Sequence, residues 1–80
     1  MELVSEEVND SVTLFNLKLS EGELVLYLDC LNYMIGNSDD NKVSLLTECS
    51  SVEELSWYRD DINSLLKNMK KKDFLPDRYR

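Results

Sequence analysis

The sequence predicts a small α+β domain in which a sheet of two to three strands is covered by two α-helices, in the chain order β-β-α-β-α. Two stretches repeat apolar residues at helical spacing, each behind an S-x-x-E motif. A third stretch, residues 12–19, is rich in β-branched, aromatic and aliphatic residues. The chain has 80 residues, 42% of them hydrophobic, and only two glycines and one proline, which indicates one folded domain rather than a disordered chain.

A hairpin is predicted around the turn sequence Asn9-Asp10-Ser11, whose residue types favour a reversal of the chain. Residues 12–19 alternate so that four side chains share one side of a strand: Thr13, Phe15, Leu17 and Leu19. We expect residues 2–7 to pair with this strand across the turn. If that first strand does not form, the order becomes β-α-β-α.

The first helix is predicted from its two ends. Ser20 and Glu23 have the spacing of a capping box, in which the serine hydroxyl accepts from the amide of residue 23 and the glutamate reaches back. Gly36 is a C-terminal stop signal. Between these ends, apolar residues recur at helical spacing and form one face: Leu24, Tyr27, Leu28, Leu31, Met34 and Ile35.

A loop and a third strand are expected between the two helices. Residues 36–41 are rich in Gly, Asn, Ser and Asp, which is typical of a loop. Residues 43–48, Val-Ser-Leu-Leu-Thr-Glu, suit a short strand.

The second helix begins with another S-x-x-E motif, from Ser51 to Glu54. Acidic residues at its start and lysines at its end both complement the helix macrodipole. Its predicted core face contains seven residues: Val52, Leu55, Tyr58, Ile62, Leu65, Leu66 and Met69. We therefore expect a single domain over residues 1–72 and a polar C-terminal tail over residues 73–80.

The net charge of −7 is unevenly distributed along the chain. Residues 1–61 hold 14 acidic residues against three basic ones, a net charge of −11, whereas residues 62–80 hold six basic residues against two acidic ones, a net charge of +4. Such a surface repels nucleic acid and anionic lipid and attracts a basic partner. The alternative is that net charge only keeps a small protein soluble. The basic run Lys70-Lys71-Lys72 lies where a helix end favours cations, so no nucleic-acid partner is expected.

The sequence lacks the residue combinations that most enzymes and metal sites need. There is no histidine, the commonest general base and metal ligand, and two isolated glycines cannot form a phosphate-binding loop. Asp39 and Asp40 lack the spacing of a calcium-binding EF-hand loop. Nothing singles out two of the 16 acidic residues as a general acid–base pair. We therefore expect a protein that is not an enzyme and that has no cofactor and no metal.

The two cysteines and the first residues bear on the cellular compartment. Cys30 and Cys49 form no CxxC motif, so we expect two reduced thiols, with Cys30 packed as a small hydrophobe. A disulfide and a reactive thiol are the alternatives. Residues 1–7 have neither a basic n-region nor an apolar h-region, and no stretch approaches the roughly 20 apolar residues of a membrane span. The expected location is the cytoplasm, with no membrane partner.

Some apolar residues lie outside the predicted core faces, and these are the candidates for partner binding. Trp57 is the strongest of them, because it points away from the core face of the second helix. Its helical neighbours include three acidic residues: Glu53, Asp60 and Asp61. On the first helix, Leu26 and Tyr33 also point away from the core, with Asp29 between them. Aromatic anchors inside a polar rim are typical of binding hot spots, whereas the alternative is a helix covered on both sides.

One segment resembles a known family. Leu17 to Leu24, with Leu31-Asn32 and Ile35-Gly36, resembles small bacterial proteins in which a strand, an L-S-x-x-E-L motif and a helix follow one another. Some of these resemble immunity proteins encoded next to toxins, including those of contact-dependent growth inhibition systems. The resemblance implies a small acidic protein that blocks a basic toxin nuclease by charge complementarity. The matching positions are structural, so it implies a role and no site residue.

The leading functional hypothesis is an acidic immunity or inhibitor protein that neutralises a basic toxin or enzyme. Carboxylates would steer the encounter and aromatic anchors would hold the complex. A second hypothesis is a regulatory or structural homodimer joined through the spare helix faces at Leu26, Tyr33 and Trp57. A third is a nucleic-acid mimic or anti-restriction protein, which would need its carboxylates in a strip at phosphate-like spacing.

Overall fold

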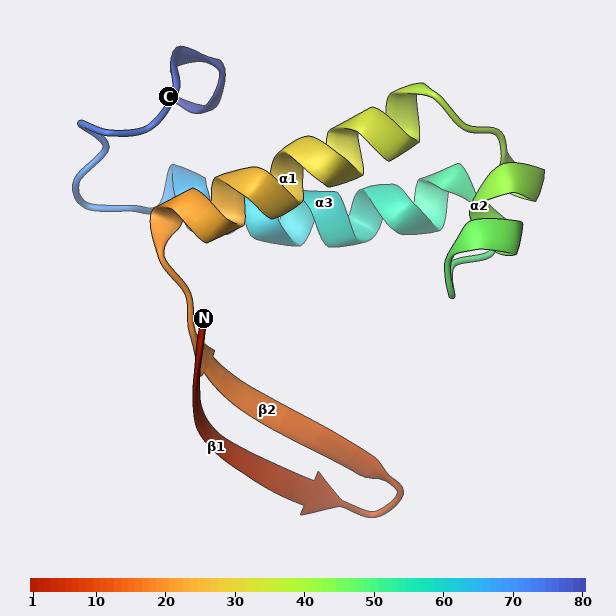
Figure 1. Ribbon diagram of the computed structural model, residues 1–80, viewed down its shortest axis with the longest axis horizontal. Helices are drawn as coiled ribbons and strands as arrows, with labels where there is room; N and C mark the ends of the chain where they lie inside the picture. The colour runs from red at the N-terminus through yellow and green to blue at the C-terminus, as the bar shows by residue number, and fades with distance from the viewer.

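The computed structural model describes residues 1–80 and contains a two-stranded antiparallel sheet and three α-helices, so the predicted α+β class is confirmed. In chain order, strands β1 (Glu2–Asn9) and β2 (Val12–Lys18) precede helices α1 (Glu21–Gly36), α2 (Asp40–Leu46) and α3 (Val52–Lys67). A short 3₁₀ turn, η1 (Asp77–Tyr79), lies near the C-terminus. The hairpin and the helices occupy separate parts of the molecule (Figure 1).

Strands β1 and β2 form the hairpin predicted around the Asn9-Asp10 turn. Asn9 lies opposite Val12, and Asp10 takes a positive φ of 54°, a conformation that aspartate tolerates better than most residues. The register places Phe15 opposite Glu6 and shifts between Leu3 and Ser5, where β1 carries an irregularity. The first strand therefore forms, and it is longer than the predicted residues 2–7.

Helices α1 and α3 begin at the predicted caps. Ser20 caps α1 as part of a complete capping box with Glu23, because each side chain bonds the backbone of the other residue. Ser51 caps α3 by accepting from the amide of Glu54, whose carboxylate in turn accepts from the amide of Ser50. Figure 1 shows α1 and α3 lying side by side along most of their length.

The predicted third strand at residues 43–48 is wrong, because Asp40–Leu46 form the helix α2. The Asp39 carboxylate accepts from the amide of Lys42 at 2.8 Å and caps this helix. The Asp40 carboxylate accepts from the amide of Val52 at 2.8 Å and ties α2 to the start of α3. Short apolar runs fit a strand or a buried helix equally well, and here the aspartate cap selects the helix.

The core lies between the two long helices and the C-terminal segment. Leu28 of α1, Leu66 of α3 and Leu75 form its centre, and all three are almost completely buried. Val43 and Leu55 are also buried. Residues 73–80, expected as a polar tail, thus contribute Leu75 to the core, and Tyr79 packs against the same cluster. Only five of the 80 residues are buried, which is a small core for a chain of this length.

The helices do not cover the sheet, and in this respect the prediction is wrong. Every residue of both strands is exposed, and the hairpin extends away from the helices from the start of α1 (Figure 1). The radius of gyration is 14.6 Å, against about 12 Å for a compact domain of this length. The physical reason is that α1 and α3 use their apolar stripes against each other and Leu75, which leaves none of the buried residues facing the sheet.

Two further expectations bear on the helices. The predicted core face of α3 is too wide, because Tyr58 and Leu65 are exposed while Leu55 and Leu66 are buried. Cys30 and Cys49 are free thiols, but Cys30 is exposed rather than packed.

No helix combines the length and the apolar character that a membrane crossing requires.

Candidate functional site

The exposed side of α3 carries the one hollow on the surface of the molecule, and four residues line it. Glu54, Trp57, Tyr58 and Asp61 enclose about 310 Å³ in a shallow depression. These residues stand at positions i, i+3, i+4 and i+7 of the helix, so they share one face. We call this group the Trp57 surface.

The two aromatic rings of the Trp57 surface are open to solvent. Trp57 is 60% exposed and Tyr58 is 56% exposed. Their position outside the core follows from the packing of α3. Leu55 and Leu66 of this helix are buried, and Ile62 packs against the core cluster, which leaves the two aromatic rings outside it. Large aromatic side chains at the surface beside carboxylates are typical of contact sites for other molecules.

The two carboxylates of the Trp57 surface have no cationic partner in the chain. None of the four ion pairs of the structure includes Glu54 or Asp61. Glu54 accepts one hydrogen bond, from the Ser50 amide at 3.0 Å, through Oε2. The Asp61 carboxylate takes part in none of the side-chain hydrogen bonds of α3. Both groups can therefore accept donors from a molecule that enters the hollow.

This combination of groups can bind a cation. A guanidinium or ammonium group is attracted to the face of a tryptophan or tyrosine ring and pairs with carboxylates at the same time. The hollow contains no nucleophile paired with a base. No group of three or more acidic residues or cysteines in the molecule could hold a metal ion.

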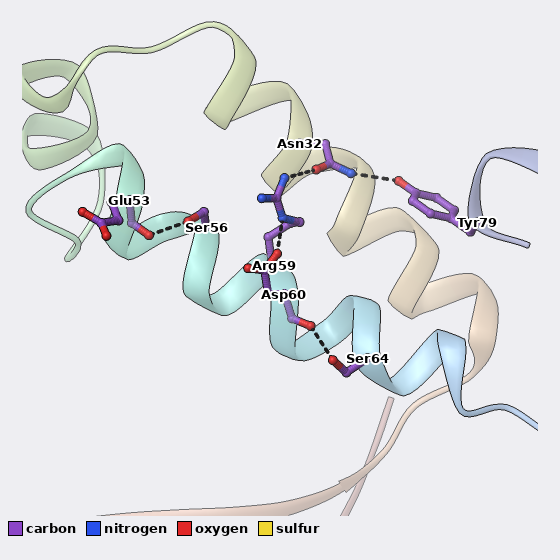
Figure 2. Close-up of polar contacts among 7 residues, drawn as sticks. All are labelled: Asn32, Glu53, Ser56, Arg59, Asp60, Ser64 and Tyr79. Carbon is purple, nitrogen blue, oxygen red and sulfur yellow. Dashed lines mark hydrogen bonds and ion pairs between the residues drawn. The ribbon is translucent and has the colours of Figure 1, made fainter.

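Two of the predicted neighbours of Trp57 flank it on the other side. The Asp60 carboxylate accepts from Nε of Arg59 at 2.7 Å, so part of its charge is already compensated. Arg59 is held by α1, because its Nη1 donates to the side-chain oxygen of Asn32 at 3.2 Å (Figure 2). The Ser56 hydroxyl donates to the main-chain carbonyl of Glu53, and the Glu53 carboxylate takes part in none of the four ion pairs. Glu53 therefore adds an uncompensated charge beside the Trp57 surface.

Asp29, predicted as a partner-binding residue, is engaged within the chain. Arg78 donates to both of its carboxylate oxygens, at 3.2 Å from Nε and 2.7 Å from Nη2. The Tyr79 hydroxyl donates to it at 2.5 Å and accepts from Asn32 at 3.2 Å. The Arg78 guanidinium and the Tyr79 hydroxyl lower the pKa of the Asp29 carboxyl. Asp29 thus fastens the C-terminal segment to α1.

Leu26 and Tyr33 are exposed, as predicted, at 57% and 71%. Both lie on α1 and neither lines the hollow on α3. Of the seven predicted residues, the structure places only Trp57 and Asp61 in the hollow. The prediction missed Glu54, which was assigned only to the cap, and Tyr58, which was assigned to the core. Glu54 lies three residues before Trp57, and Tyr58 lies three residues before Asp61. This helical spacing was the signal that could have identified them.

Comparisons with family models, with curated proteins and with solved structures find no match for this chain.

Proposed function

We propose that this chain is an acidic protein-binding protein that neutralises a basic toxin or enzyme, in the manner of an immunity or inhibitor protein. The observation that carries the proposal is the Trp57 surface, where two exposed aromatic rings and two unpaired carboxylates line one hollow. An arginine or lysine side chain of the partner would enter this hollow. The chain would act by occupying its partner and not by catalysis.

The charge of the molecule supports the same proposal over a longer range. The net charge of −7 attracts a cationic protein and speeds the encounter. The contact between the Trp57 surface and the basic side chain of the partner would determine how long the complex lasts. Glu53 extends the negative field beside the hollow, because its carboxylate takes part in no ion pair. The segment from Leu17 to Leu24 resembles small bacterial proteins, some of which resemble immunity proteins, and this resemblance suggests the same role.

The proposal can be tested with synthetic peptides, because Trp57 is the only tryptophan and its fluorescence reports on the hollow directly. The probe is a short peptide with two neighbouring arginines, and its counterpart carries glutamates instead. We expect saturable quenching or a spectral shift with the arginine peptide, weakened by added salt. The glutamate peptide should have no effect.

Charge-matched variants separate the hollow from the overall charge. The double variant Glu54→Gln, Asp61→Asn should weaken binding of the arginine peptide about tenfold or more. The double variant Glu6→Gln, Glu48→Gln removes the same charge from exposed sites outside the hollow and should bind almost as well as the unaltered chain. Equal loss in both variants, or no response of Trp57 to the arginine peptide, would contradict the proposal.

A further inference from the structure

The hairpin has an apolar face that nothing in the chain covers. The pairs Leu3–Leu17, Glu6–Phe15 and Val8–Thr13 share one side of the sheet, and four of these six residues are large and apolar. Phe15 is 59% exposed, and Leu3, Val8 and Leu17 are exposed as well. An isolated two-stranded hairpin is marginal in water, whereas three or more strands with an apolar face are stable. The hairpin therefore needs further strands or a cover.

The two edges of this hairpin are not equivalent. Strand β1 carries three acidic residues, Glu2, Glu6 and Glu7, and the irregularity between Leu3 and Ser5. Charges and bulges are the devices by which proteins prevent an edge strand from pairing with another chain. Strand β2 has no acidic residue, no proline and no register shift over its seven residues, and Lys18 at its end is its only charge. The free edge of β2 is therefore open to pairing, and that of β1 is protected.

We infer that β2 pairs antiparallel with β2 of a second copy of this chain, which gives a symmetric dimer with a four-stranded sheet in the order β1-β2-β2-β1. Phe15 is the middle residue of β2, so the two-fold axis passes beside it and the two Phe15 rings lie opposite each other. In this register Leu17 lies opposite Thr13 of the second copy. The apolar sides of the two hairpins then form one continuous face.

Charge favours a second copy of this chain over another partner at this edge. In the symmetric register Lys18 lies opposite Val12 of the second copy, next to the turn that contains Asp10 of the second copy, and a lysine side chain is long enough to reach that turn. Neither Lys18 nor Asp10 takes part in an ion pair within the chain. The symmetry provides this pairing twice. A strand of a basic protein would find no carboxylate on β2 to select it.

The negative charge of the chain does not prevent this pairing. The acidic residues of the hairpin strands lie on β1, which forms the two outer strands of the four-stranded sheet. Three strand spacings separate the two β1 strands, about 14 Å. At physiological ionic strength the Debye length is about 8 Å, so repulsion between these strands is largely screened. The inferred dimer leaves the Trp57 surface on α3 untouched, and it does not depend on the proposed function.

The mass in solution tests this inference, measured by sedimentation equilibrium over a range of micromolar concentrations. We expect a reversible dimer. The Phe15→Lys variant places two like charges opposite each other and should raise the dimer dissociation constant about 100-fold. The control Val8→Lys alters the same apolar face on β1, away from the interface, and should leave the dimer intact. Circular dichroism checks that both variants keep their helices.

Crosslinking locates the contact. In a Cys30→Ser, Cys49→Ser background, Phe15→Cys should form an intermolecular disulfide on mild oxidation, and Val8→Cys should form far less. A monomer at all concentrations would overturn the inference. So would a dimer that Phe15→Lys leaves intact, because its interface would lie elsewhere, for example at Tyr33 on α1. Equal crosslinking of the two cysteine variants would overturn it as well.

Discussion

The helical part of the molecule and the hairpin are built on different principles. Helices α1 and α3 with the C-terminal segment bury Leu28, Leu66 and Leu75 completely or almost completely, and side-chain hydrogen bonds join all three segments. The hairpin buries no residue and relies on its backbone ladder and the bond from Asn16 to Ser5 at 2.7 Å. The helical part thus contains a hydrophobic core of its own, whereas the apolar residues of the hairpin are exposed and available to the inferred second copy.

The polar contacts show the same division. A continuous chain of hydrogen bonds runs from Arg59 on α3 through Asn32 on α1 to Tyr79 (Figure 2). It joins residues that are 20 to 47 positions apart in the sequence, so it connects α1, α3 and the C-terminal segment to one another. The hairpin is joined to the helices by the connection at Leu19-Ser20 and by the terminal amine of Met1, which pairs with Glu23 at 2.6 Å.

The largest expected effect is at the centre of the helical core. Leu66→Ala removes a fully buried side chain and should lower the free energy of unfolding by about 2–5 kcal/mol. A domain of this size has roughly 3–5 kcal/mol in total, so the variant should be largely unfolded. The neighbouring Leu65 is exposed, and Leu65→Ala should change stability by less than about 1 kcal/mol. Urea denaturation followed by circular dichroism measures both, and similar losses would show that the core is misplaced.

A smaller effect is expected where the C-terminal segment meets α1. Tyr79→Phe removes the hydroxyl that links Asp29 and Asn32 and should lower the free energy of unfolding by about 1 kcal/mol. Tyr33→Phe is the matched control, because the Tyr33 hydroxyl has no partner in the chain and the side chain is exposed. Its stability should match that of the unaltered protein. Equal effects of the two substitutions would mean that the C-terminal segment does not dock on α1.

The smallest effect is the pH dependence of the pair between Asp29 and Arg78. Folding lowers the pKa of the Asp29 carboxyl below its ordinary value of 3.8, so the unfolded chain binds this proton more readily. The resulting stabilisation is complete above the ordinary pKa and is lost as the pH falls through the lowered pKa. Because both side chains are partly exposed, solvent screening keeps the effect small.

Variants at Asp29 and Asp73 measure this contribution. Asp29→Asn should be less stable than the unaltered chain at neutral pH, and the difference should shrink as the pH falls below 3.8. Asp73→Asn removes a charge whose carboxylate has no ion pair, so it should show no such convergence. Urea titrations at a series of pH values give the comparison. A constant difference at all pH values would show that the pair does not form.

The features predicted correctly from the sequence are those that local chemistry determines. The serine caps at Ser20 and Ser51 mark the helix starts, and the Asn9-Asp10 turn with its flanking residues marks the hairpin. The prediction of a third strand was wrong because the apolar run after Asp39 fits a strand or a helix, and Asp39 was not recognised as a helix cap. Trp57 was predicted to face away from the core stripe of α3, and it is exposed and lines the hollow together with Asp61. Binding of a partner at these residues stays a prediction.

The features that the sequence did not predict depend on which helices, strands and segments pack against one another in the folded chain. Helical periodicity shows that α1 and α3 have an apolar stripe, but not that each stripe packs on the other helix rather than on the sheet. The partner of Asp29 lies 49 residues away at Arg78, which no local pattern indicates. Tyr58 was assigned to the core because a tyrosine on the edge of an apolar stripe can face either way.

The most direct test of the contrast between the two regions is amide hydrogen exchange measured at several protein concentrations. We predict that the amides of α1 and α3 around Leu28 and Leu66 are the most protected and do not respond to concentration. The amides of β2 should exchange fast in dilute protein and become protected as the concentration rises and the second copy binds. Hairpin amides as protected as the helix core in dilute protein would contradict the account, because the hairpin would then be stable on its own.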